Sequence, residues 1–131
     1  MEGEHRDAAG RSAPVSGETT IRHGEGKWHF EGVLRVRGER PALQHNRYEI
    51  EPFSAGARST HWTSANPVLG TLHGRFVLAG DAILSFYSNP GGRYRGYECL
   101  QQRDERRYSV RGAMMEQDKL ISTWALELTL N

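Results

Sequence analysis

A chain of 131 residues, 37% of them hydrophobic, is the size of one domain and can bury a real core. The formal net charge of +1 does not favour a protein built to bind nucleic acid or an anionic membrane surface. The single cysteine, Cys99, cannot form an intrachain disulfide, which favours a reducing cytoplasm. We interpret Cys99 as a small hydrophobe within a strand rather than a reactive thiol.

The first 25 residues are rich in Gly, Ser, Ala, Glu and Arg, and Val15 and Ile21 are their main apolar side chains. Such a segment cannot offset the entropy lost on ordering, so we expect residues 1–25 to form a flexible tail. Residues 26–131 should then form the folded domain. No apolar segment typical of a signal peptide or a membrane-spanning helix is found, so we expect a cytoplasmic protein without a membrane partner.

After this tail, apolar and polar residues alternate with a period of two, which is typical of half-buried strands. In the first such stretch, Trp28 and Phe30 share one face and His29 points the other way. Turn residues such as Asn89-Pro90-Gly91-Gly92 separate the stretches. The expected strands are Lys27–Arg37, His45–Phe53, Arg58–Thr63, Leu72–Ala79, Ala82–Tyr87, Arg93–Leu100, Arg107–Met114 and Leu120–Leu128.

No segment shows a convincing helical period, so the sequence predicts an all-β domain. About eight antiparallel strands in succession are typical of a small up-and-down β-barrel, whose interior holds side chains or one small ligand. Glycines in the middle of strands indicate the bulges or sharp bends that a small barrel needs. These glycines are Gly32, Gly74, Gly96 and Gly112.

Gly26-Lys27-Trp28 opens the first expected strand, and Trp124 lies in the last one. On these residues the chain resembles the calycin superfamily of lipocalins and avidin-like barrels. Those barrels begin with a Gly-x-Trp whose Trp closes one end, and avidin-like barrels carry a Trp in their final strand. The resemblance implies a calycin-like barrel with a ligand in its interior, but it does not imply which ligand.

One face of these strands would line the barrel interior. Ligand sites combine apolar walls with a few placed polar groups, and Tyr and Trp side chains supply both. The predicted ligand-binding residues are Trp28, Tyr48, Trp62, Tyr94, Glu98, Tyr108 and Trp124, and Asn46, Thr60 and Ser122 share their face. The alternative is a filled core in which these side chains find partners inside the protein.

Glu98 is the most informative of these residues, because a buried carboxylate must be paired or protonated. Inside the barrel it would serve as a general acid or base, or as a ligand anchor, and Arg75 or Arg111 would be its simplest partner if a bulge shifts the strand phase. The opposite phase of the strand buries Tyr97 and Cys99 equally well. We favour that phase, which would leave Glu98 on the surface.

No cofactor or metal is predicted. The six histidines show no spacing typical of a metal site, and no catalytic motif or phosphate-binding loop is present. The stretch Arg93–Tyr97 interleaves Arg and Tyr, but it lies in an expected strand and does not by itself favour nucleic acid.

Three functions stay open. The leading hypothesis is a binding protein that holds a small, largely apolar or aromatic molecule. A cofactor-independent isomerase, cyclase or dehydratase would use Glu98, Tyr48 and Tyr108 in the same interior, and we favour a protein without catalysis over it. The third is an interaction protein: the strand Ala82–Tyr87 is apolar on both faces, which suits assembly into a homodimer.

Overall fold

Strands account for most of the chain in the computed structural model, which describes residues 1–38, 41–66 and 69–130. In chain order they are β1 (Glu2–Arg6), β2 (Ser12–His23), β3 (Trp28–Val36), β4 (Ala42–Ile50), β5 (Ser59–Asn66), β6 (Gly70–Ala79), β7 (Ala82–Ser88), β8 (Tyr94–Gln102), β9 (Arg107–Glu116) and β10 (Lys119–Thr129). Each strand pairs antiparallel with the next, and β1 also pairs with β10, so the sheet closes into an up-and-down barrel. None of the described residues belongs to a helix that could span a membrane.

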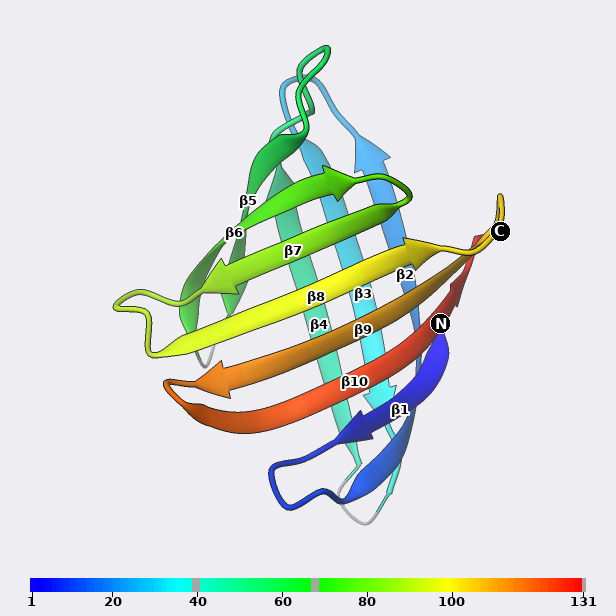
Figure 1. Cartoon of the computed structure of the whole chain (residues 1–131), viewed down its shortest axis with the longest axis vertical. Helices are drawn as coiled ribbons and strands as arrows, with labels where there is room; N and C mark the ends of the chain where they lie inside the picture. Colours follow the sequence, from blue (N-terminus) through cyan, green and yellow to red (C-terminus); the bar gives the residue numbers. More distant parts are fainter. Residues whose placement is uncertain (39–40, 67–68, 131) are drawn as a thin grey trace.

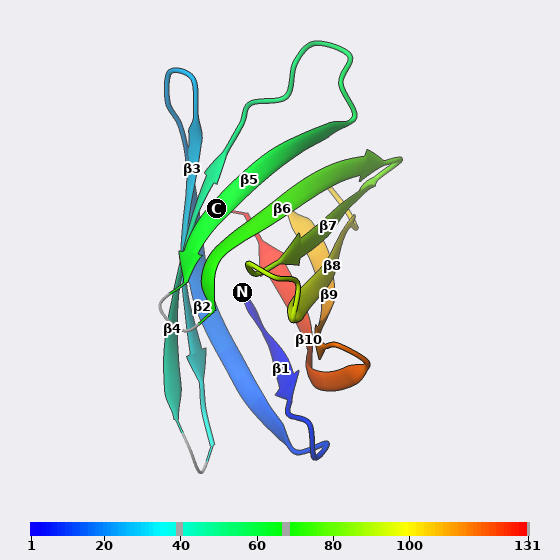
Figure 2. The ribbon, with the colours of Figure 1, turned by 90° about the vertical axis from the view of Figure 1, so that its left-hand side faces the viewer.

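The barrel has two long walls that face each other. Strands β7 to β10 cross in front of β2 to β4 in Figure 1, and the two groups lie on opposite sides of the molecule in Figure 2. Strands β5 and β6 curve from one wall to the other, and β1 joins β10 to β2 on the other side. Closure pairs the strand edges that an open sheet would leave exposed to other chains.

The all-β barrel is confirmed, with ten strands rather than eight. Each of the eight predicted strands has a counterpart, and the ends differ by a few residues. The largest shift concerns the predicted strand His45–Phe53, which is observed as Ala42–Ile50. Pro52 and Phe53 lie beyond its end, since proline lacks the N–H that a strand ladder needs.

The two additional strands correct our expectation of a flexible tail, because β1 and β2 lie within residues 1–25. Strand β2 pairs with β3 over nine residues, from Val15 opposite Val36 to His23 opposite Trp28. Val15 is 5% exposed and packs with Val110 of β9 and Leu126 of β10. Composition alone did not predict these strands, because backbone pairing to two neighbouring strands orders a segment that has few apolar side chains of its own.

The core consists of two separate clusters rather than one. The first contains Val15, Val110 and Leu126, and the second contains Ile50, Trp62 and Leu72. These six are the fully buried hydrophobic residues among those described. The accessible surface is 8935 Å², whereas a compact monomer of this mass exposes roughly 7,000 Å². The shape is therefore less compact, and hairpins protrude from the barrel in Figure 1.

The mid-strand glycines have a different role from the predicted one. A Cβ at Gly74 would lie 2.1 Å from Cε2 of Trp62, and one at Gly112 would lie 2.2 Å from Cε2 of Trp124. Gly96 likewise underlies the Tyr87 ring. In each case the ring belongs to the residue directly opposite on the neighbouring strand. These glycines therefore make room for aromatic side chains, and the shift in register occurs elsewhere, between Leu120 and Ser122.

The outer wall around β7 and β8 is partly apolar. Phe86 and Tyr97 are each 43% exposed, and their rings meet edge to face with centroids 6.1 Å apart. On the inner side of the same strand, Ser85 is buried and Tyr87 half-buried. The expectation that this strand carries apolar residues on both faces is confirmed, and assembly into a homodimer stays a prediction.

Candidate functional site

The strand register places all seven predicted ligand-binding residues on the inner face of the barrel. The chain of cross-strand partners runs from Trp28 to Ile50, Trp62, Gly74 and Tyr87, which fixes this face from β3 to β7. The same alternation continues through β8 to β10. In these strands the inward residues include Tyr94, Glu98, Tyr108, Ser122 and Trp124. By the same register, Asn46, Tyr48 and Thr60 face inward from β4 and β5.

Five of the inward rings form an aromatic cluster that spans β3 to β7. Tyr48 stacks on Phe30 with centroids 5.0 Å apart and on Trp62 at 4.4 Å. Trp62 also contacts Phe76 at 5.8 Å and Tyr87 at 5.4 Å. Tyr48 and Trp62 are among the predicted ligand-binding residues, whereas Phe30, Phe76 and Tyr87 are not. Tyr87 lies two positions after the buried Ser85 and so shares its face. This alternation would have identified Tyr87 as an inward residue.

Trp62 lies at the centre of this aromatic cluster and is 2% exposed. Its indole nitrogen, Nε1, is buried, and no described residue accepts a hydrogen bond from it. A buried donor without an acceptor costs about 1–3 kcal/mol. The ring nevertheless stays in place because Gly74 leaves space for it and three other rings surround it.

Glu98 projects into the barrel beside this aromatic cluster. Its Oε2 accepts a hydrogen bond of 2.7 Å from Nε1 of Trp124. The surface position that we favoured is therefore wrong, and Tyr97 takes the outward place instead. The strand register fixes the direction in which the Glu98 side chain points, since it pairs Glu98 with the buried Ser85 and with Gly112.

The predicted arginine partners of Glu98 lie on the outer surface. Arg75 contacts Nε2 of His61 at 3.1 Å, and Arg111 pairs with Glu127 at 3.4 Å. Glu98 is therefore held by an indole N–H and not by a cation.

Burial has the largest effect on the pKa values of the ionisable side chains around Glu98. Desolvation raises the pKa of the Glu98 carboxyl, and the hydrogen bond from Trp124 lowers it to a smaller extent. Burial also raises the pKa of the Tyr48 and Tyr87 hydroxyls well above the usual range, and the charge of Glu98 raises both further. One carboxyl and two phenols from three strands thus interact inside the barrel. We refer to Glu98, Trp124, Tyr48 and Tyr87 as the Glu98 group.

The other predicted residues lie apart from the Glu98 group. Trp28 stacks on His23 at 4.4 Å, at the end of the barrel where β3 begins. The Tyr94 ring lies 5.4 Å below the Arg93 guanidinium at the start of β8. Tyr108 is half-buried and opposite Leu128. The structure thus brings together four of the seven predicted residues: Tyr48, Trp62, Glu98 and Trp124.

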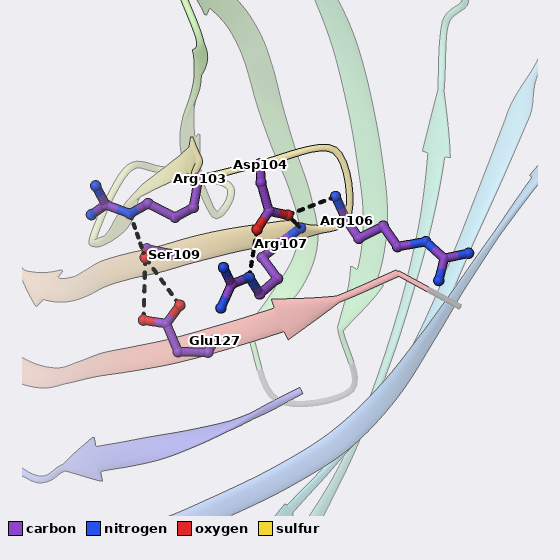
Figure 3. Close-up of polar contacts among 6 residues, drawn as sticks. All are labelled: Arg103, Asp104, Arg106, Arg107, Ser109 and Glu127. Carbon is purple, nitrogen blue, oxygen red and sulfur yellow. Dashed lines mark hydrogen bonds and ion pairs between the residues drawn. The ribbon is translucent and has the colours of Figure 1, made fainter.

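A second group of polar side chains surrounds the turn from β8 to β9 (Figure 3). Asp104 accepts hydrogen bonds from the backbone N–H groups of Arg106 and Arg107, which lower its pKa together with the Arg107 side chain. Close by, Ser109 accepts a hydrogen bond from Arg103 and donates one to Glu127. Every charged side chain in this group is exposed, and the contacts satisfy backbone and neighbouring side chains. We assign the group to the stability of the turn.

Surface depressions lie outside the barrel. One, of about 550 Å³, is at the β9–β10 turn and is lined mostly by charged residues, with Arg93 and Glu116 paired at 2.6 Å. A smaller one of about 280 Å³ lies over β10 between Arg6 and Arg111. Within the described ranges, no three His, Cys, Asp or Glu side chains lie close enough to hold a metal ion.

No protein-family model and no curated protein sequence matches the chain. Its backbone is similar to that of a solved structure, the S-type phycobiliprotein lyase CPES from Guillardia theta. The TM-score is 0.67, over 99% of this chain and 84% of that one. The two sequences are 8% identical, so the likeness concerns the fold. The predicted antiparallel up-and-down barrel is confirmed as a fold.

Proposed function

We propose that the protein binds a small, largely apolar or aromatic molecule inside the barrel, against the aromatic cluster and the Glu98 group. The observation that carries the proposal is the aromatic cluster itself, in which five rings from five strands line one part of the inner wall. Flat apolar walls with a few polar groups are typical of ligand sites in barrels. The phycobiliprotein lyase supports the proposal only as a protein with a similar fold.

Two further observations support a bound molecule rather than a filled interior. Phe30, Tyr48, Phe76 and Tyr87 face inward but stay partly accessible, so solvent reaches their part of the wall. Between the two core clusters, the inner wall carries small or polar residues such as Thr19, Gly32 and Asn46. An acceptor on a ligand would also satisfy the indole N–H of Trp62.

A neutral fluorescent probe tests the proposal directly. We expect N-phenyl-1-naphthylamine to bind saturably and to quench the tryptophan emission by energy transfer from Trp62 and Trp124. The substitution Tyr48→Ala should weaken binding about tenfold, because it removes a stacked ring from the wall (about 1.4 kcal/mol). Tyr97→Ala is the matched control, since it removes a ring from the outer face.

Absence of saturable binding, or equal weakening by the two substitutions, would contradict the proposal. Thermal shift and native mass spectrometry against a set of metabolites would then identify the natural class of ligand.

Catalysis is the second candidate function, and the Glu98 group is the observation that favours it. A carboxyl whose pKa is raised by burial keeps its proton to a higher pH than an ordinary glutamate, and its charge acts on two phenols. An isomerase, cyclase or dehydratase would release a ligand of changed structure. Chromatography of ligands recovered from wild type and from Glu98→Gln would show that change in the wild type alone.

A further inference from the structure

The inner wall has an unusual distribution of charge. At the strand positions that face inward in the described ranges, the only Lys or Arg is Lys119, which is exposed at the rim opposite Glu116. The ion pairs between neighbouring strands lie on the outer face instead: Arg22 with Glu31, Lys27 with Glu49, Arg35 with Glu18, and Arg111 with Glu127. Inward carboxylates are Glu98 and, at the rim, Glu116, which is paired with Arg93.

Glu98 is therefore a buried acid without a cationic partner in the described chain. Trp124 donates to Oε2, and no described residue donates to Oε1. Removing a carboxylate from water without a compensating charge is costly, and a partner of opposite charge offsets that cost. One oxygen is thus oriented by the protein, and the other is available to a ligand.

The aromatic rings next to Glu98 also favour a positively charged ligand. Aromatic faces carry a negative potential and attract cations, more strongly when the site is desolvated. Tyr48, Trp62 and Tyr87 present such rings in mutual contact, and Tyr87 lies opposite Gly96, two positions before Glu98 on the same inward face.

We propose that the ligand of this barrel is an organic cation, either a protonated amine or a quaternary or heteroaromatic nitrogen on a flat apolar body. Glu98 is its counter-ion, Trp124 holds Glu98 in position, and the aromatic cluster contacts the cation and its apolar body. This inference rests on the proposed function and specifies the chemistry of its ligand.

Two isosteric probes test the charge preference. Phenyltrimethylammonium carries a fixed positive charge, and tert-butylbenzene has the same shape without charge. We expect the wild type to bind the cation at least tenfold more tightly, measured by displacement of N-phenyl-1-naphthylamine. Glu98→Gln should abolish this preference and leave binding of tert-butylbenzene within about twofold. Glu18→Gln, which removes a carboxylate from the outer face, should retain it.

The dependence of binding on pH adds a second measurement, made on the wild type and on Glu98→Gln. Phenyltrimethylammonium does not titrate, so its affinity should fall as the pH is lowered and Glu98 takes up a proton. The groups that face Glu98 are Tyr48 of β4, Tyr87 of β7 and the indole of Trp124. The imidazole of His5 lies opposite Trp124 on β1. Comparison with Glu98→Gln separates its effect from that of Glu98.

The outcomes distinguish the two proposals. Equal or tighter binding of tert-butylbenzene by the wild type overturns the inference alone, because a neutral ligand is then preferred at the same site. Retention of the cation preference in Glu98→Gln also overturns it. Failure of both probes and of N-phenyl-1-naphthylamine to bind overturns the inference together with the proposed function.

Discussion

At the scale of single residues, the central contact of the interior is the hydrogen bond between Trp124 and Glu98. The contact with Trp124 crosses β9, since Gly112 of that strand lies between the two residues in the register. A side chain on Gly112 would occupy the space of the Trp124 ring. The hydrogen bond therefore depends on a glycine that the sequence suggested only as a bend.

The raised pKa of Glu98 predicts a specific dependence of stability on pH. In the unfolded chain the carboxyl loses its proton near the ordinary glutamate pKa of 4.5, and burial in the folded protein raises this pKa. As the pH rises between these two values the unfolded state is favoured, so the wild type loses stability. We expect the free energy of unfolding of the wild type, minus that of Glu98→Gln, to fall as the pH rises above about 4.5.

Urea denaturation at a series of pH values measures this difference. The substitution Glu18→Gln on the exposed outer face is the control and should show no such fall. A difference that increases with pH would mean that the folded protein stabilises the carboxylate, which contradicts burial as the dominant cause.

The glycines under the aromatic rings lead to a second prediction. Gly74→Ala would place a methyl group 2.1 Å from the Trp62 ring, so the ring must move, at a cost of about 1–3 kcal/mol. Gly32→Ala is the matched control, because Gly32 is also inward and in mid-strand but its nearest neighbour is a Thr19 methyl group at 3.2 Å. Chemical denaturation should show a large loss for Gly74→Ala and a small change for Gly32→Ala. Equal effects would show that the rings do not depend on these glycines.

The sequence predicted which residues face inward, but not which of them meet. Alternation alone assigned Tyr48, Trp62 and Trp124 to the correct face, since a period of two leaves two choices for each strand. For Glu98 both choices buried equally good side chains, so the pattern could not decide. The pairing of β8 with β7 and β9 decided it, and such pairing is not visible within one strand.

At the scale of elements, the N-terminal strands show what composition misses. Residues 1–25 contain few apolar side chains, yet they close the barrel between β10 and β3. Hydrogen bonds to two neighbours satisfy the backbone of β1 over its length, and Val15 adds a buried side chain to β2. Local sequence carries little information about such long-range pairing.

Two substitutions within β2 test whether this strand belongs to the core. Val15→Ala should lower the free energy of unfolding by about 2 kcal/mol, because two buried methyl groups are removed and a cavity remains. Ile21→Ala, in the same strand but 55% exposed, should change it by less than about 0.5 kcal/mol. Equal and negligible effects of both changes would favour the flexible tail that the composition suggested.

At the scale of the whole molecule, closure is uneven around the barrel. Strands β8 and β9 pair over nine positions, whereas β4 and β5 pair only through Glu49 with Thr63 and Ile50 with Trp62. From Ala42 to Tyr48, β4 is paired with β3 alone. Most side chains of this stretch are exposed. The seam between β4 and β5 is therefore the weakest part of the wall, and it adjoins the aromatic cluster through Tyr48 and Trp62.

Hydrogen exchange measures this unevenness and connects it with binding. In an antiparallel strand every second residue turns its N–H away from a given neighbour, so within 42–48 those amides lack a strand partner. They should exchange at least tenfold faster than the amides of β9, which is paired on both sides. A ligand stacked on Tyr48 should slow exchange in β4 and leave the protection of β9 unchanged. Uniform protection around the barrel, or a ligand effect centred on β9, would contradict both the weak seam and the position of the site beside it.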